Sequence, residues 1–228
     1  MILAIETSSH LCSVAFWQDG RVLLQYNLDM PMQHAELLAK IVDEGLRFLS
    51  EKPIKTPCSV KDIQLVGVGI GPGSFTGLRI GLSYAQGFCF ASQIPIAGIS
   101  SHQIFAGQSI TGYDTVFTII DARRNEVYCA ELSLSSTGYW AIINHQILNK
   151  TELGNALPDT CQLICSKDIK LEQEIKAQLH EKHILINTNG HLTADIVAVM
   201  AQYKFQMHGG DDLQTLEPMY IRSFAGVL

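Results

Sequence analysis

The sequence predicts an α/β protein made of two similar halves with a cleft between them. In the first half, apolar segments occur in the order strand, strand, strand, helix, strand, helix and strand. From residue 115 the second half begins the same order again, in a shortened form. A third observation is a buried strand that ends in a glycine-rich turn and continues as a helix. Strands and helices that alternate in this way are typical of layered α/β folds.

Three strands and a helix are predicted at the start of the chain. Residues 2–5 are apolar, residues 12–17 alternate between apolar and polar, and residues 22–26 follow a turn at Asp19-Gly20. Apolar residues of segment 34–49 recur at helical spacing, opposite a face of charged residues. These segments predict a three-stranded meander followed by an amphipathic helix.

The glycine-rich segment that follows is the most informative part of the chain. Residues 65–70 have the apolar pattern of a buried strand, and residues 76–91 have apolar positions at helical spacing. Between them, Gly71-Pro72-Gly73-Ser74 cannot continue the strand, because proline lacks an amide hydrogen. A glycine turn before a helix presents free amides that can hold a phosphate. The P-loop frame is absent, however, so close backbone packing is the competing interpretation.

The second half repeats this order of elements without repeating the residues themselves. An apolar strand leads to Asp121, a turn follows at residues 122–125, and a second strand alternates after it. Shorter helices and strands complete the half. The predicted strands are residues 115–120, 126–134, 140–148, 163–165 and 183–186, and the predicted helices are residues 171–180 and 193–203.

Polar residues stand at the ends of the first strand of each half. Two acidic strand-end residues that face one cleft are an arrangement that holds Mg²⁺ and phosphate in some nucleotide-binding folds. The alternative is an ordinary hairpin turn, in which these side chains form hydrogen bonds within the turn itself. Both interpretations stay open from the sequence. The candidate nucleotide-cleft residues are Glu6, Thr7, Ser8, Ser9, Gly73 and Asp121.

Composition restricts the classes of function. The chain of 228 residues is 47% hydrophobic and 17% charged, has a formal net charge of −6, and carries no basic cluster beyond Arg123-Arg124. Independent binding of DNA or RNA is therefore not expected. No basic leader and no apolar run of membrane-spanning length are visible, so we expect a cytoplasmic protein without a membrane partner. The histidines lack H-x-x-x-H spacing, and we expect no metal site.

Cysteine nucleophiles are left open by the sequence, although most of the six cysteines lie within apolar patterns and are expected to be structural. The helix at residues 76–91 carries a further signal, because Arg79 is the only charged residue between Asp62 and Asp114. A helix that is apolar nearly all round is either buried on both sides or shared with another chain.

Several motifs together resemble the TsaB family (YeaZ-type). The resemblance is specific in the glycine-rich segment and covers most of the chain outside residues 135–214. Its motifs are Ile2-Leu-Ala-Ile-Glu-Thr-Ser8, Gln33-His-Ala-Glu-Leu-Leu38, Gly69-Ile-Gly-Pro-Gly-Ser-Phe-Thr-Gly-Leu-Arg-Ile-Gly81, Gly98-Ile-Ser-Ser101, Ile120-Asp-Ala-Arg-Arg-Asn-Glu-Val-Tyr128 and Pro218-Met-Tyr-Ile-Arg222.

The resemblance implies an actin/Hsp70-like (ASKHA) duplicated β-β-β-α-β-α fold with subdomains at residues 1–104 and 105–228, the second reduced. It also implies a non-catalytic scaffold that works with TsaD and the ATPase TsaE. In that system TsaC makes threonylcarbamoyl-adenylate, and TsaD transfers the threonylcarbamoyl group to N6 of adenosine 37 in tRNAs that read codons beginning with adenine. ATP is then used by the complex, no cofactor is expected in this chain, and tRNA is contacted only through the partner.

The family pairs through the helices of the first half, in homodimers or with TsaD. Carried over to this sequence, the expected interface residues are His34, Leu38, Ile41, Val42, Gly45, Leu78, Arg79, Leu82, Ala85 and Phe88. Burial of these helices under the strands is the competing interpretation. A charge at Leu82 or Ala85 distinguishes the two, since it breaks either association or the fold.

Two other functions stay in play. An ATP-dependent enzyme such as a small kinase needs Mg-ATP at the strand-end residues. Glu6 stands where many ASKHA proteins have aspartate, and no glycine follows it to let a phosphate approach. A glycoprotease-like metallopeptidase is the third hypothesis, and the missing histidine pair argues against it.

Overall fold

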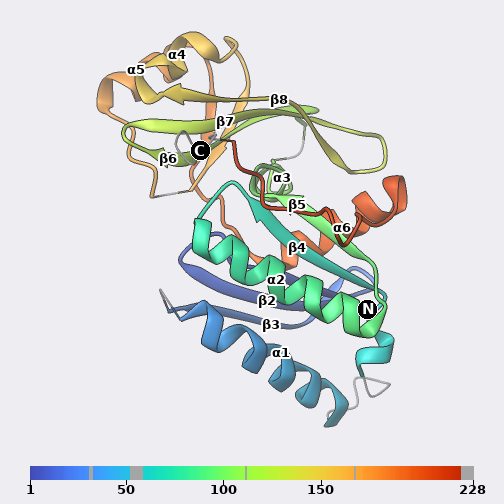
Figure 1. Ribbon diagram of the computed structural model, residues 1–228. Helices are drawn as coiled ribbons and strands as arrows, with labels where there is room; N and C mark the ends of the chain where they lie inside the picture. The colour runs from blue at the N-terminus through green and yellow to red at the C-terminus, as the bar shows by residue number, and fades with distance from the viewer. Residues whose placement is uncertain (31–32, 52–58, 111, 167, 222–228) are drawn as a thin grey trace. The chain divides into compact units, whose positions relative to one another are not determined.

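The computed structural model describes residues 1–30, 33–51, 59–110, 112–166 and 168–221 (Figure 1). The chain divides into two compact units. Unit 1 comprises Met1–Ser101 and Leu192–Pro218, and unit 2 comprises His102–His191 and the residues from Met219 onward. Cys58 and Arg222 lie outside the described residues.

Unit 1 is a five-stranded sheet with helices on both faces (Figure 1). The strand order is β3-β2-β1-β4-β5, in which β1, β2 and β3 are antiparallel and β1, β4 and β5 are parallel. Its elements are β1 (Ile2–Glu6), β2 (Leu11–Gln18), β3 (Arg21–Asp29), α1 (His34–Glu51), β4 (Leu65–Gly71), α2 (Phe75–Ser92), β5 (Ile96–Ser100) and, from the end of the chain, α6 (Ala194–His208).

Strand alternation decides which helix covers which face of this sheet. Val66 and Val68 of β4 point into a core that contains Leu38 of α1 and Leu82 of α2. A Cβ on Gly67, between the two valines, would lie 2.8 Å from the Cβ of Ala201 on α6. Since neighbouring side chains of a strand point to opposite faces, α1 and α2 cover one face and α6 covers the other.

Unit 2 has the same sheet topology with smaller helices. The order β8-β7-β6-β9-β10 repeats the order of unit 1, with an antiparallel meander and two further parallel strands. The four-residue α4 and the nine-residue α5 contribute to a core with the sheet. The elements are α3 (Ser101–Ala106), β6 (Thr115–Arg123), β7 (Glu126–Leu134), β8 (Trp140–Asn149), α4 (Leu153–Ala156), β9 (Gln162–Cys165), α5 (Gln173–Glu181) and β10 (Leu185–Asn187), with short 3-10 turns at Val60–Asp62 and Lys150–Glu152.

The duplicated β-β-β-α-β-α fold with a reduced second half is confirmed by these two sheets. The units differ from the predicted subdomains of residues 1–104 and 105–228 in one respect. Helix α6 packs on β1, β2 and β4, and residues 192–218 therefore belong to unit 1. The physical reason is that Gly67 of β4 leaves room for Val197 and Ala201 against the sheet.

Candidate functional site

The predicted strand-end residues of unit 1 lie together, where the β1–β2 turn meets the start of α2. Glu6, the last residue of β1, is fully buried, and its Oε1 accepts a hydrogen bond of 2.5 Å from the backbone amide of Ser8. Its Oε2 has no hydrogen-bond partner among the residues that the structure describes. A Cβ on Gly69 would overlap this oxygen, so glycine is required there for the carboxyl group to fit.

The turn is bonded directly to the first turn of α2. The amide of Ser74 donates to the carbonyl oxygen of Ser8 at 2.7 Å, and the hydroxyl of Thr7 donates to the carbonyl oxygen of Gly77 at 2.8 Å. The Ser74 hydroxyl caps the helix by accepting from the amide of Gly77 at 3.3 Å. A Cβ on Gly73 would lie 2.5 Å from the Ser8 carbonyl oxygen, and one on Gly77 would overlap that of Thr7.

These contacts are the close backbone packing that competed with a phosphate site. Two of the amides at this helix start, those of Ser74 and Gly77, already donate within the chain and are not available to an anion. Ser8 is buried and its hydroxyl lies 3.3 Å from that of Ser101. The Ser9 hydroxyl accepts from the amide of Leu11 at 3.2 Å, as expected for a turn satisfied by its own side chains.

Asp121, the sixth candidate, lies in β6 of unit 2. Its carboxylate is 3.7 Å from Nζ of Lys150 and 3.9 Å from Nε of Arg123, and its side chain is 42% exposed. The nucleotide role of the six candidates stays a prediction.

Burial controls the protonation of Glu6. It raises the pKa of the carboxyl group, and the hydrogen bonds from Ser8 and Thr7 oppose that shift. The folded protein therefore binds more protons than the unfolded chain once the pH rises above the ordinary pKa of 4.5, and the stability contributed by this group is lost as the pH rises.

Replacing Glu6 with glutamine is expected to remove this pH dependence. Relative to the native chain, the Glu6→Gln variant should gain free energy of unfolding as the pH rises from about 4 to about 8. Urea unfolding across that range measures the difference, with the exposed Glu44→Gln as the matched control. A difference between Glu6→Gln and the native chain that does not change with pH would contradict the assignment.

Two kinds of group that are candidates for chemistry, the cysteines and His102, are buried in this structure. Of the six cysteines, the five that the structure describes are buried and unpaired, and burial raises their pKa, to about 12 for Cys129 for example. His102 is fully buried, its Nδ1 lies 2.7 Å from the hydroxyl of Thr118, and burial lowers its pKa to about 3. A thiol that stays protonated at neutral pH is a weak nucleophile, and an imidazole with so low a pKa is a weak base. The burial of His102 was not predicted from the sequence.

Most of the residues expected at the interface are buried within unit 1, which favours the competing interpretation that the strands cover these helices. Both helices turn their apolar stripes toward the sheet, so these side chains are covered within their own unit. Gly45, for instance, packs so closely on the ring of Phe16 that a Cβ would overlap it. Phe88 is half-buried, and only Arg79 is exposed. The buried residues are His34, Leu38, Ile41, Val42, Gly45, Leu78, Leu82 and Ala85.

Helix α2 nevertheless has an exposed face of unusual composition. The guanidinium of Arg79 lies 3.9 Å from the centre of the Phe75 ring, a cation–π contact, and Arg79 is the only charged residue of this face. Phe90 is 72% exposed, and a Cβ on Gly87 would meet no atom within 4 Å. We call this set the outer face of α2; its residues are Phe75, Thr76, Arg79, Ser83, Gly87, Phe90 and Ala91.

No helix among the described residues is long and apolar enough to cross a membrane. No group of three or more histidine, cysteine or acidic residues among them is placed to hold a metal ion.

The fold defines an α/β protein of the actin-like, two-subdomain class. Two solved structures from Pseudomonas aeruginosa share it. One, "YeaZ from Pseudomonas aeruginosa", has a TM-score of 0.76 at 24% identity and covers 96% of this chain and 98% of its own. The other, an uncharacterized protein with similarity to peptidase YEAZ, has a TM-score of 0.78 at 23% identity, with coverage of 97% and 99%.

Sequence comparison places the chain more narrowly. The family model described as "TsaD: tRNA N6-adenosine threonylcarbamoyltransferase" matches residues 31–159. The chain therefore belongs to this family, and within it the chain is of the TsaB (YeaZ) type.

Three relatives carry the name "tRNA threonylcarbamoyladenosine biosynthesis protein TsaB". The Escherichia coli (strain K12) protein is 37% identical over 141 residues, which span 61% of this chain and 58% of the relative. The Haemophilus influenzae protein is 31% identical over 133 residues, or 58% and 53% of the two chains. The protein from Buchnera aphidicola subsp. Schizaphis graminum is 27% identical over 194 residues, or 81% and 87%. The chain thus spans little more than half the length of the first two relatives.

Proposed function

We propose that this chain is a non-catalytic subunit required, with TsaD and TsaE, for synthesis of threonylcarbamoyladenosine in tRNA. In this role it supports transfer of the threonylcarbamoyl group from threonylcarbamoyl-AMP to N6 of adenosine 37 in tRNAs that read codons beginning with adenine. The names of the relatives and the matching family support the pathway. ATP is used by the complex, and tRNA is held mainly by the partners, in agreement with a net charge of −6.

The observation that carries the subunit role is the internal bonding of the start of α2. In unit 1, the helix terminus that would bind a phosphate donates the amides of Ser74 and Gly77 within the chain, to the Ser8 carbonyl and to its own cap. This arrangement favours a scaffold over the alternative of a small ATP-dependent kinase, because it leaves fewer free donors at this terminus for a nucleotide phosphate.

The outer face of α2 is the surface that we propose for the partner, TsaD in the complex and a second copy of the chain when it is alone. Exposed aromatic rings and a single arginine, without lysine or acidic residues, match the composition of interface centres. This surface replaces the buried residues expected from the sequence and retains Arg79 from that prediction.

The proposal is tested by reconstitution on unmodified tRNA with TsaC, TsaD, TsaE, ATP, threonine and bicarbonate. Mass spectrometry should detect threonylcarbamoyladenosine when the chain is added and little or none when it is left out. Equal modification without the chain, with partners from the same organism, would contradict the proposal.

A further inference from the structure

The free edge of β5 is covered by the segment that follows α6. The backbone amide of Asp211 donates to the carbonyl oxygen of Ile96 at 2.8 Å, in an isolated antiparallel bridge. The carboxylate of Asp211 accepts from the amide of Gly98 at 2.7 Å. We call residues 209–216 the C-terminal strap. The strap forms hydrogen bonds with backbone amide and carbonyl groups that an edge strand otherwise leaves unpaired.

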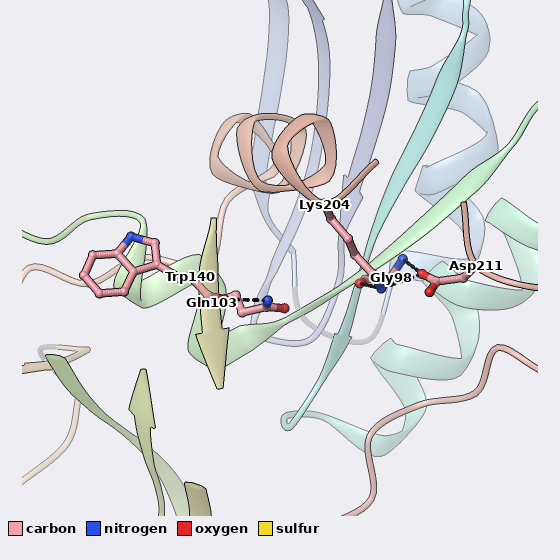
Figure 2. Close-up of polar contacts among 5 residues, drawn as sticks. All are labelled: Gly98, Gln103, Trp140, Lys204 and Asp211. Atoms are coloured by element: carbon pink, nitrogen blue, oxygen red, sulfur yellow. Dashed lines mark hydrogen bonds and ion pairs between the residues drawn. The ribbon is translucent and has the colours of Figure 1, made fainter. Parts of the chain in front are cut away.

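A lysine of α6 completes this closure (Figure 2). Nζ of Lys204 donates to the carbonyl oxygen of Gly98 at 2.9 Å and to Oδ2 of Asp211 at 2.7 Å. The amide and the carbonyl of Gly98 are thus bonded by two side chains of opposite charge. These side chains are only 17% and 26% exposed, so salt screens their attraction less than that of a surface pair.

The strap is also bonded to α2. Nε2 of Gln86 donates to the carbonyl oxygens of Leu213 at 3.0 Å and Leu216 at 2.9 Å. Leu213 and Leu216 pack against the core of unit 1, and a Cβ on Gly98 would lie 2.9 Å from a methyl group of Leu216. One short segment therefore connects α6, the edge of β5 and the C-terminal half of α2.

We propose that the strap is a latch that couples α2 to the edge of β5. Lys204 and Asp211 hold the strap against β5, and the hydrogen bonds of Gln86 connect the strap to α2. Opening the latch at Lys204 therefore loosens the helix that bears the outer face, although Lys204 itself lies on α6. The latch is a property of unit 1 alone and holds whether or not the chain takes part in tRNA modification.

Hydrogen exchange of the full chain tests the coupling. Lys204→Met keeps the aliphatic stem and removes both hydrogen bonds of the ammonium group. Exchange is expected to accelerate about tenfold in residues 211–216 and also in residues 84–92 of α2, as loss of a hydrogen bond to a charged group allows. Unchanged exchange in α2, with or without a faster strap, would overturn the proposal.

A second variant, made on the α2 side of the contact, tests the same coupling if Lys204→Met does not fold. Gln86→Met changes only α2 and is expected to accelerate exchange in residues 211–216 by a similar factor of about ten. Unchanged exchange in those residues would also overturn the proposal. Glu44→Gln, which breaks the exposed 2.5 Å pair of Glu44 with Arg47, is the matched control and should leave both segments unchanged.

Discussion

Replacing Gly77 with alanine is expected to destabilise the protein more than any other single methyl addition in α2. The new Cβ would overlap the backbone carbonyl oxygen of Thr7, which cannot move away as the end of a flexible side chain can. The start of α2 would have to separate from the β1–β2 turn, and the hydrogen bonds from Ser74 to Ser8 and from Thr7 to Gly77 would lengthen.

Overpacking of this kind costs about 1–3 kcal/mol, and loss of the two hydrogen bonds adds to it. For a chain of this size we expect the melting temperature to fall by about 5–12 °C. Gly87→Ala on the same helix is the matched control, because its Cβ meets no atom within 4 Å. Alanine is the better helix former by about 1 kcal/mol, so this control should be slightly more stable than the native chain. A native-like melting temperature for Gly77→Ala would contradict the packing described at the start of α2.

Replacing Gly87 with lysine is expected to abolish association with TsaD while leaving the fold intact. Lysine is a better helix former than glycine, and the position is open, so the melting temperature should not fall. The long charged side chain would stand on the outer face of α2, about one turn from Ser83 and from Phe90. The dissociation constant should rise at least 30-fold, roughly the effect of losing one hot-spot contact of about 2 kcal/mol.

Phe90→Lys tests the same face by removing an exposed ring, and a cation near a helix C-terminus is tolerated by the helix dipole. Ile143→Lys on β8 is the matched control, since Ile143 is also exposed, at 61%, and lies in unit 2. Calorimetric titration with TsaD measures each variant. If Gly87→Lys and Phe90→Lys bind as tightly as Ile143→Lys, the interface lies elsewhere.

The alternation of apolar segments was sufficient to predict the architecture. Helix α1 was predicted at residues 34–49 and occupies His34–Glu51, and the β8 strand was predicted at residues 140–148 and occupies Trp140–Asn149. Local periodicity determines such elements, because one face of each must be buried. The return of α6 to unit 1 could not be predicted in the same way. It depends on Gly67 of β4, which meets Val197 and Ala201 across more than a hundred residues of chain.

The candidate sites show the same difference between what adjacent residues predict and what contacts between distant residues decide. Hydroxyls and a carboxylate at the end of β1 were predicted correctly as a group, since they are adjacent in sequence. Their use in holding α2 was not predictable, because it requires Gly73 and Gly77 to meet Ser8 and Thr7 in space. The expected interface residues come from the helices through which the family pairs, and the apolar stripe of a helix does not reveal whether a sheet or a second chain covers it. Gly87 and Phe90 lie on the side of α2 opposite its buried apolar stripe. The same helical periodicity therefore predicts them as exposed positions.

We propose that this chain supports threonylcarbamoyl transfer through the outer face of α2. The most direct measurement is the yield of threonylcarbamoyladenosine on unmodified tRNA in the reconstituted mixture, with the native chain, Gly87→Lys, Ile143→Lys or no chain. We expect modification with the native chain and with Ile143→Lys, and little with Gly87→Lys or without the chain. Full modification with folded Gly87→Lys would contradict the role of that face, and full modification without the chain would contradict the subunit role itself.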